Sequence, residues 1–141
     1  MNKNVYEIFE ELKLAEDDFE RVDMLCRNSS YALKSVLKGI FHPDVQFTIS
    51  ETPKYKRSDS PIGLGYSNMT QELSRAYLFE ANNPKVSPNL SPERKIQILV
   101  QILETLEAKE ADVYMNMILK KSPIPELTYE VVKKSFPDLL P

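Results

Sequence analysis

The sequence predicts an all-α fold, a compact single-domain bundle of about seven helices with a long irregular loop at residues 42–66. Three observations lead to this prediction. Apolar residues recur three and four positions apart in segment after segment, as expected for amphipathic helices. Ser, Thr or Asp precedes several of these segments and proline follows them, as at helix ends. A length of 141 residues favours one domain, so residues 1–141 are expected to form a single helical unit.

Three helices are expected before residue 42. The first covers residues 4–15, and the second begins near Asp17 and Asp18, whose carboxylates suit a helix N-terminus. The third begins after a Ser29 or Ser30 cap and ends at "HPD", because the residue before proline resists helical dihedral angles. The predicted buried faces are Val5, Ile8, Phe9 and Leu12; Phe19, Val22, Leu25 and Cys26; and Leu33, Val36, Leu37, Ile40 and Phe41.

Residues 42–66 interrupt the helical pattern. "VQFTI" alternates apolar and polar residues, which predicts a short extended piece without a partner strand and therefore no sheet. We expect Phe47, Ile49 and Tyr55 to pack back on the core, between two helical halves. A fourth helix is expected over residues 67–80, followed by the loop "NNPKVSPN". Its predicted buried residues are Met69, Leu73, Ala76, Tyr77 and Phe79.

The segment "LSPERKIQILVQILETL" has the clearest helical pattern. Ser91 is the expected N-cap and Pro92 the first helical residue. A wide apolar face predicts that this helix is central in the bundle. A sixth helix follows almost at once, and a seventh is capped by Thr128 and ended by Pro137. The apolar positions of the fifth helix are Ile96, Ile98, Leu99, Val100, Ile102, Leu103 and Leu106.

The residues favour a protein that is not an enzyme and takes no cofactor or metal. His42 is the single histidine and Cys26 the single cysteine, so a zinc site lacks its usual ligands, and we expect Cys26 to be a small core residue. "GLG" lacks the rest of a dinucleotide loop, and no phosphate-binding GxxxxGK[ST] motif occurs. No small-molecule substrate is indicated. The acidic pairs Glu10–Glu11 and Asp17–Asp18 are expected on solvated helix faces.

A location inside the cell is expected. The chain begins without the apolar core of a signal peptide and has no run of 18 apolar residues, so no membrane span is predicted. The net charge of −3 argues against a protein coated in positive charge, but not against a local basic patch.

Basic residues are gathered in small groups outside an acidic N-terminal region. Residues 7–23 contain eight acidic residues and only two basic ones. In the long loop, Lys54, Lys56 and Arg57 surround Tyr55, a combination that can hold a phosphate backbone and stack on a sugar or base. Each group alone is more simply a solvated face, so DNA binding requires that the groups converge in three dimensions. The other groups are Lys34 and Lys38, Arg94 and Lys95, Lys120 and Lys121, and Lys133 and Lys134.

Two family resemblances add to this interpretation. The blocks "ERVDMLCRNSSYALKSVLKGIFHPDVQFTI", "PKYK", "KIQILVQILETLEAKEADVYMNMILKK" and "LTYEVVKKSFPDLLP" resemble small proteins of T-even-like tailed phages. That resemblance implies no established activity, although some such phage proteins are lysis-inhibition accessory proteins. The same block order over residues 18–141 resembles the all-helical N-terminal DNA-binding domain of phage ATP-dependent DNA ligases.

The ligase resemblance implies a DNA-facing surface but no ligation chemistry. The ligase domain precedes a nucleotidyltransferase domain with a KxDG motif, and no KxDG occurs here. "SPIPEL" also replaces a glycine-containing turn, and proline lacks the N–H that could donate to phosphate. By position, the implied DNA-binding residues are Lys120, Lys121, Ser122, Thr128, Lys133 and Lys134, and the loop residues Lys54, Lys56 and Arg57 join them as candidates. All four of these C-terminal lysines are expected to be exposed.

Two functions remain open from the sequence. One is a non-catalytic phage accessory protein with a ligase-type DNA-binding fold, which binds duplex DNA or a replication or host protein. The alternative is a protein-interaction regulator, such as a lysis-inhibition accessory or host-takeover factor, that binds no nucleic acid. The acidic N-terminal helices and the prolines of "SPIPEL" favour the alternative. Either protein would act in the cytoplasm of the infected host cell.

Overall fold

A computed structural model describes residues 3–61 and 67–141 of the chain. In these residues it has seven α-helices, one 3₁₀ turn and no β-strand, which confirms the predicted all-α class. Gly63 and Gly65, part of the predicted loop, lie outside the described residues. The elements are α1 (Val5–Leu12), α2 (Asp18–Arg27), α3 (Tyr31–Phe41), α4 (Met69–Leu73), the 3₁₀ turn η1 (Ala76–Phe79), α5 (Pro92–Thr105), α6 (Ala108–Ile118) and α7 (Tyr129–Ser135).

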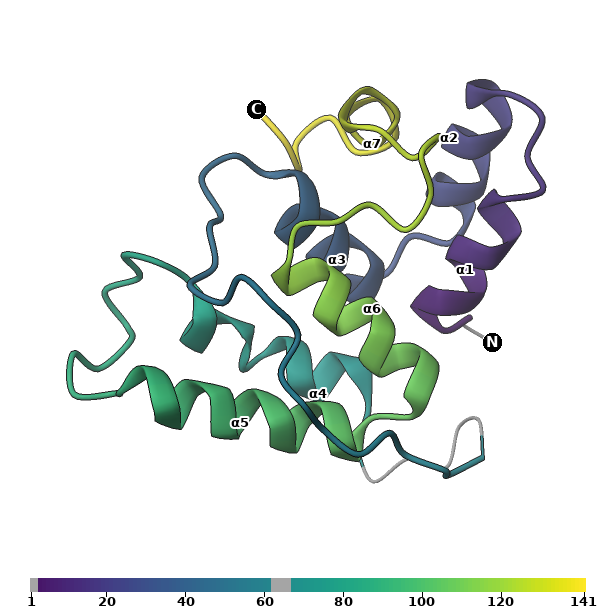
Figure 1. Cartoon of the computed structure of the whole chain (residues 1–141). Coiled ribbons are helices and arrows are strands. Elements are labelled where there is room, and N and C mark those ends of the chain that lie inside the picture. Colours follow the sequence, from purple (N-terminus) through teal and green to yellow (C-terminus); the bar gives the residue numbers. More distant parts are fainter. Residues whose placement is uncertain (1–2, 62–66) are drawn as a thin grey trace.

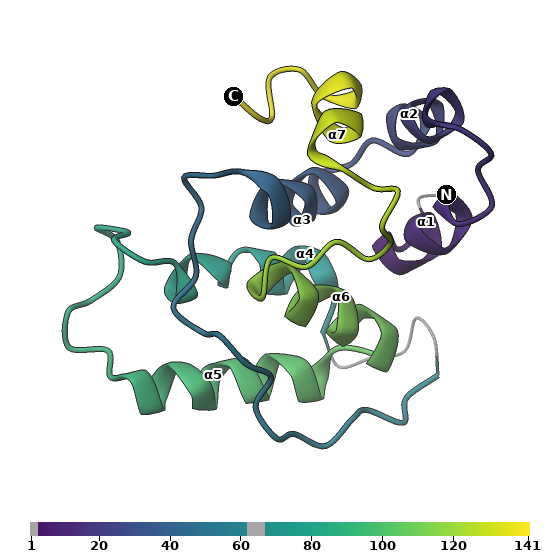
Figure 2. The same ribbon diagram turned by 45° about the horizontal axis from the view of Figure 1, so that its top comes forward.

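Helix α6 occupies the centre of the bundle. It packs against α1, α3 and α5, while α2 and α7 lie side by side at one end and α5 at the other (Figures 1 and 2). The prediction that the fifth helix is central is therefore wrong. Helix α5 buries Leu99 and Leu103 completely, whereas Ile96, which is on the same face but nearer the N-terminal end of the helix, is 42% exposed.

Side-chain caps begin most of the helices. Asp17, Ser30, Ser91 and Thr128 each accept a hydrogen bond from a backbone N–H in the first turn that follows them, as the sequence predicts. Asn68 does the same for α4. Because each cap satisfies a donor that the helix cannot use itself, these five polar residues set where the helices begin.

A close approach of α3 and α6 depends on Gly39. A Cβ atom at this position would lie 2.5 Å from Met117 Cγ, and Met117 is only 2% exposed. Glycine therefore lets the two helix backbones come closer than alanine would.

The irregular loop runs from the end of α3 down across α5 (Figure 1). Its extended piece makes one isolated antiparallel bridge, Phe47 with Glu80, rather than a strand. Ile49 is buried, and Phe47 and Tyr55 are partly buried against the core, as predicted. The predicted helix over residues 67–80 is interrupted, because α4 ends at Leu73 and the chain continues as η1.

Two predictions about α2 are wrong. Phe19 is 83% exposed rather than buried, and Cys26 is exposed rather than part of the core. Helix α2 lies at the edge of the bundle and packs mainly against α7 and α1, so its buried face is narrower than its apolar pattern. Leu25 is its one fully buried residue, and the Cys26 thiol donates weakly to the Ser135 carbonyl oxygen at 3.4 Å.

Candidate interaction surfaces

Lys120 holds the end of α3 in place. Its Nζ donates to three backbone carbonyl oxygens, those of Gly39 (2.8 Å), His42 (3.0 Å) and Val45 (2.6 Å). Gly39 is in the last turn of α3, where carbonyl groups lack partners inside the helix and a cation is favourable. Burial lowers the pKa of the Lys120 ammonium, whereas the three oxygens favour its charged form.

The backbone of Lys120 also has an unusual conformation. Its φ is 56°, in the left-handed region that favours glycine. Its N–H donates to Met117 O (3.0 Å), and the N–H of Lys121 donates to Asn116 O (2.8 Å). These two bonds form a Schellman motif that ends α6, with lysine where glycine is usual. We attribute the presence of lysine at this position to its side chain, because a long cationic side chain is needed to reach the three carbonyl groups.

Two polar residues of the implied DNA surface, exposed Ser122 and partly buried Thr128, make hydrogen bonds to backbone groups close to them in the chain. The single proton of the Ser122 hydroxyl is shared between two carbonyl oxygens of the same loop, those of Ile124 (2.8 Å) and Leu127 (2.7 Å). The Thr128 hydroxyl caps α7 by accepting from Val131 N–H at 3.3 Å. Both groups thus have a structural role, which the sequence predicted for the Thr128 cap but not for Ser122.

The remaining lysines of the C-terminal group differ from one another. Lys133 Nζ donates to the carbonyl oxygens of Pro137 (2.8 Å) and Leu140 (2.7 Å), which fastens the final residues to α7. Lys121 and Lys134 are exposed. The prediction that all four C-terminal lysines are exposed is therefore correct for Lys121 and Lys134 and wrong for Lys120 and Lys133, which are partly buried because they satisfy helix-end and chain-end carbonyl groups.

The loop group is only partly available to a partner. Lys54 and Lys56 are exposed, and the Lys56 backbone N–H donates to Glu104 Oε2 at 2.8 Å. The Arg57 guanidinium makes a two-point ion pair with Asp112, and this contact raises its pKa. These contacts fix the loop to α5 and to the beginning of α6.

The two basic groups do not form one cluster. The loop group is attached to Asp112 in the first half of α6, whereas Lys120 follows the other end of that helix. Asp112 is six residues from Ile118, the last residue of α6, which corresponds to a rise of about 9 Å along the helix axis. Lys133 and Lys134 lie farther away, on α7, which packs against α2. Among the described residues, no hydrogen bond or ion pair joins the loop group to the C-terminal lysines.

The connection between α1 and α2 presents an apolar surface that the sequence pattern did not predict. Leu14 is 79% exposed and Phe19 is 83% exposed. The carboxylates of Glu16, Asp17 and Glu20 flank them, and in the described chain none of the three has a Lys or Arg partner within 4 Å. We call these five residues the acidic–apolar edge. The sequence "EDDFE" contained one indication of it, since a phenylalanine between acidic residues on both sides is hard to bury without burying charge.

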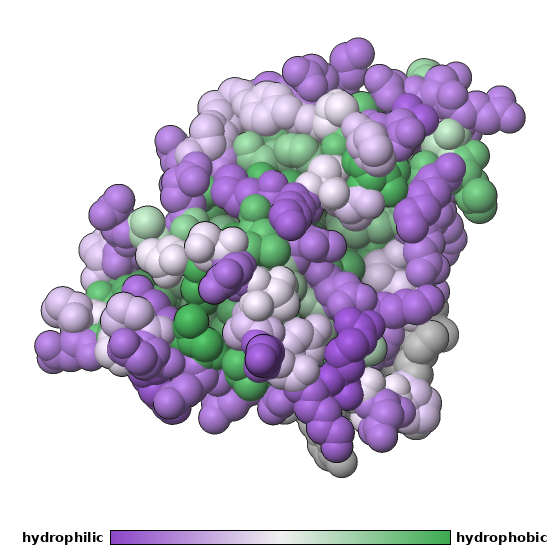
Figure 3. All heavy atoms as spheres, viewed as in Figure 1, coloured by the Kyte–Doolittle hydropathy of each residue, from purple (hydrophilic) through white to green (hydrophobic). Residues whose placement is uncertain are grey.

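Figure 3 shows hydrophobic atoms at the α1–α2 end of the molecule, bordered by hydrophilic atoms. Other acidic residues of this region have cationic partners: Glu10 with Lys109 (3.2 Å), and Asp23 with Arg27 (2.8 Å). Arg21, at the same end, pairs with Asp18 (2.6 Å), so among the described residues the acids of the acidic–apolar edge differ from these in having no ion-pair partner of their own.

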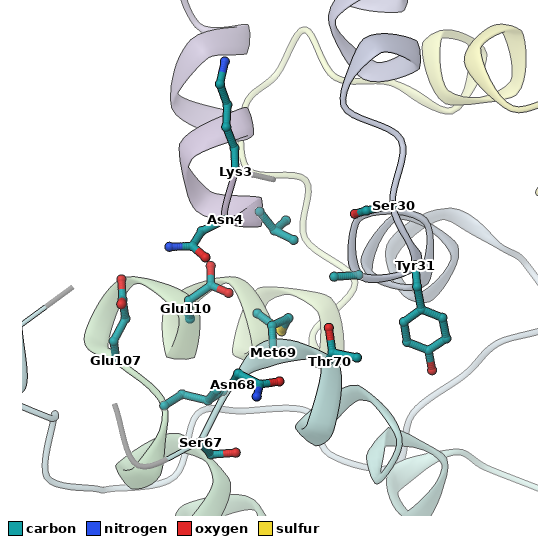
Figure 4. A pocket seen from close by; sticks show the side chains of 13 residues that line it. Lys3, Asn4, Ser30, Tyr31, Ser67, Asn68, Met69, Thr70, Glu107 and Glu110 are labelled. Atoms are coloured by element: carbon teal, nitrogen blue, oxygen red, sulfur yellow. The ribbon is translucent and has the colours of Figure 1, made fainter. Parts of the chain in front are cut away.

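A cavity of about 420 Å³ lies where the first turns of α1, α3, α4 and α6 meet (Figure 4). Glu107 and Glu110, both 6% exposed, line it from α6. Glu110 Oε1 accepts the backbone N–H of Tyr6 in the first turn of α1 at 3.3 Å. Burial raises the Glu110 pKa to about 7, and the charges of Glu107 and Glu7 add to this effect.

In the described residues no group of three His, Cys, Asp or Glu side chains could hold a metal ion. In the same residues, none of the helices combines the length and the hydropathy needed to cross a membrane.

The fold and its surfaces define an all-helical domain with an acidic, partly apolar edge and dispersed basic residues. Residues 8–122 match a family of unknown function, DUF6433, and the chain belongs to that family. No curated protein matches the chain.

Proposed function

We propose that this protein is a non-catalytic protein-binding domain that uses the acidic–apolar edge to bind a partner protein. The observation that carries the proposal is the exposure of Leu14 and Phe19 amid three carboxylates without cationic partners. Exposed large apolar side chains with a polar rim are typical of protein interaction sites, and phenylalanine is enriched in the buried centres of interfaces.

The chemistry of this edge specifies its partner. Phe19 and Leu14 require an apolar hollow that removes them from water. Around that hollow, Lys or Arg would complement the charges of Glu16, Asp17 and Glu20, whereas an acidic rim would repel them and a neutral rim would give no electrostatic gain. The expected partner is therefore a basic protein surface with an apolar centre.

The alternative of duplex DNA binding has less support from the structure. Lys120, Lys133 and Arg57 make contacts inside the protein, and Ser122 and Thr128 bond to neighbouring backbone groups. A DNA surface would then depend on scattered exposed lysines, in a chain whose net charge is −3.

The resemblances stated above suggest a setting for this activity. If the chain is a phage protein with a ligase-type helical fold, its partner is a replication or host protein in the cytoplasm of the infected cell. A lysis-inhibition or host-takeover factor fits the same chemistry. We propose this setting on the resemblance alone.

The test compares two variants that remove exposed apolar side chains from different places. The immobilised Leu14→Ser/Phe19→Ser variant and an Ile96→Ser control are used to capture proteins from nuclease-treated host lysate. The expected result is a basic protein that wild type and the control retain and the double variant loses. Retention of the same proteins by all three would refute the proposed edge.

A DNA arm uses a 30-base-pair duplex at several salt concentrations. The protein-binding proposal predicts no measurable affinity, and no difference between wild type and Lys121→Ser/Lys134→Ser. If wild type binds and the logarithm of affinity falls steeply with log salt, by about 0.9 for each phosphate contact, DNA binding replaces the proposal.

A further inference from the structure

The cavity at the start of α1 contains a buried acid that the proposed function does not use. Glu110 joins α6 to α1 through one hydrogen bond, from Tyr6 N–H to its carboxyl oxygen. Figure 4 shows Glu110 projecting from α6 toward Asn4, at the beginning of α1. A carboxyl group in this position changes its charge without changing its shape, so the same contact exists in a neutral and a charged form.

We propose that Glu110 is a pH-sensitive latch that holds the first turn of α1 on α6, closed when its carboxyl group is protonated and weakened when it ionises. The geometry supports this assignment in two ways. Glu110 as a residue is only 6% exposed, and it lines a cavity large enough to admit water when a charge needs hydration.

The groups around Glu110 determine the direction of the switch. From α1, Glu7 adds negative charge, Lys3 lies at the cavity wall, and Tyr6 supplies the N–H. From α6 itself, Glu107 adds a second buried acid. From α3, Tyr31 lines the cavity, and the α4 lining contains no ionisable side chain.

Negative neighbours and burial both disfavour the ionised form, whereas the Tyr6 N–H favours it. Burial dominates, and the Glu110 pKa rises to about 7 from an ordinary 4.5. When α1 separates from α6, the pKa of Glu110 returns to its ordinary value. The closed form is therefore favoured most well below pH 7, and this preference weakens as pH rises through about 7.

The size of the effect follows from these two pKa values. Between pH 6 and pH 8 the equilibrium for closing α1 should fall about tenfold. Helix α1 remains helical and mostly docked, because Val5, Ile8, Phe9 and Leu12 are buried against the core. The latch therefore changes how often α1 opens, rather than whether it folds.

The primary experiment measures amide hydrogen exchange of α1 at pH 6, 7 and 8, corrected for the intrinsic pH dependence of exchange. Three proteins are compared: wild type, Glu110→Gln, and the exposed control Glu126→Gln. Protection of the α1 amides should fall about tenfold in wild type and in the control, and less than twofold in Glu110→Gln, since glutamine keeps the acceptor for Tyr6 N–H without ionising.

Two further readouts keep the proposal open to refutation. A carboxyl ¹³C titration should place the Glu110 pKa near 7, and a value below 5 would overturn the latch. In wild type at pH 8, α1 amides should also exchange faster than those of α6. Equal exchange rates in the two helices would show that Glu110 affects only global unfolding, and the latch would be rejected.

Discussion

The contact between Lys120 and the end of α3 leads to a prediction in which two effects of one residue oppose each other. The side chain stabilises the fold by donating to three carbonyl oxygens, while its left-handed backbone conformation destabilises it. Hydrogen bonds to charged groups contribute about 1.5–3 kcal/mol each when buried. Because Lys120 is only partly buried, water can replace part of this contribution, and we expect Lys120→Ala to cost about 2–4 kcal/mol.

Lys120→Gly separates the two effects. Glycine loses the same three hydrogen bonds but adopts a φ of 56° without the steric penalty of a side chain, which is about 1–2 kcal/mol. The glycine variant should therefore be more stable than the alanine variant by about 1 kcal/mol, and still less stable than wild type. The exposed neighbour gives the matched control, since Lys121→Ala should change stability by less than about 0.5 kcal/mol.

The measurement is urea unfolding of the four proteins, followed by circular dichroism at pH 7. Three outcomes would refute the reasoning: an alanine variant as stable as wild type, a glycine variant no more stable than the alanine variant, or an equal loss in Lys121→Ala. The first would show that the carbonyl groups of Gly39, His42 and Val45 are satisfied equally well by water.

The remaining predictions concern the core and the buried acid. Leu99→Ala should cost about 2–5 kcal/mol in urea unfolding, since Leu99 is fully buried, whereas Ile96→Ala should cost less than about 1 kcal/mol; equal losses would contradict the packing of α5. Gly39→Ala should lower stability by about 1–3 kcal/mol despite the better helix propensity of alanine, because the alanine Cβ would lie 2.5 Å from Met117 Cγ. A gain in melting temperature would show that Met117 moves aside. Glu110→Gln should gain stability relative to wild type as pH rises from 5 to 8, by up to about 3 kcal/mol. With a folded-state pKa of about 7, the protonated Glu110 stabilises wild type fully below pH 4.5, and this stabilisation is lost as pH rises through 7. A stability difference between the two proteins that stays constant across this range would refute the raised pKa.

The sequence alone determined the fold class and most helix ends. Helical spacing of apolar residues and local capping chemistry are properties of a few neighbouring residues, so Ser91 and Thr128 could be identified as caps from the residues that follow them in the chain, and the cap of α3 could be narrowed to Ser29 or Ser30. The packing of the irregular loop could also be predicted from the sequence, because burial against the core removes its apolar residues from water.

Only the tertiary structure decided which face of each helix is covered and what each basic residue contacts. Phe19 has an apolar spacing that fits a buried face, yet it is 83% exposed because α2 packs mainly on α7 and α1 through other residues. The sequence around Lys120 is that of an ordinary surface lysine, yet the carbonyl groups that its side chain contacts lie 75 to 81 residues earlier in the chain. Glu110 meets the N–H of Tyr6 across 104 residues. Contacts over such separations are set by how whole helices pack, which depends on every side chain between them, so local spacing could not have placed these three residues.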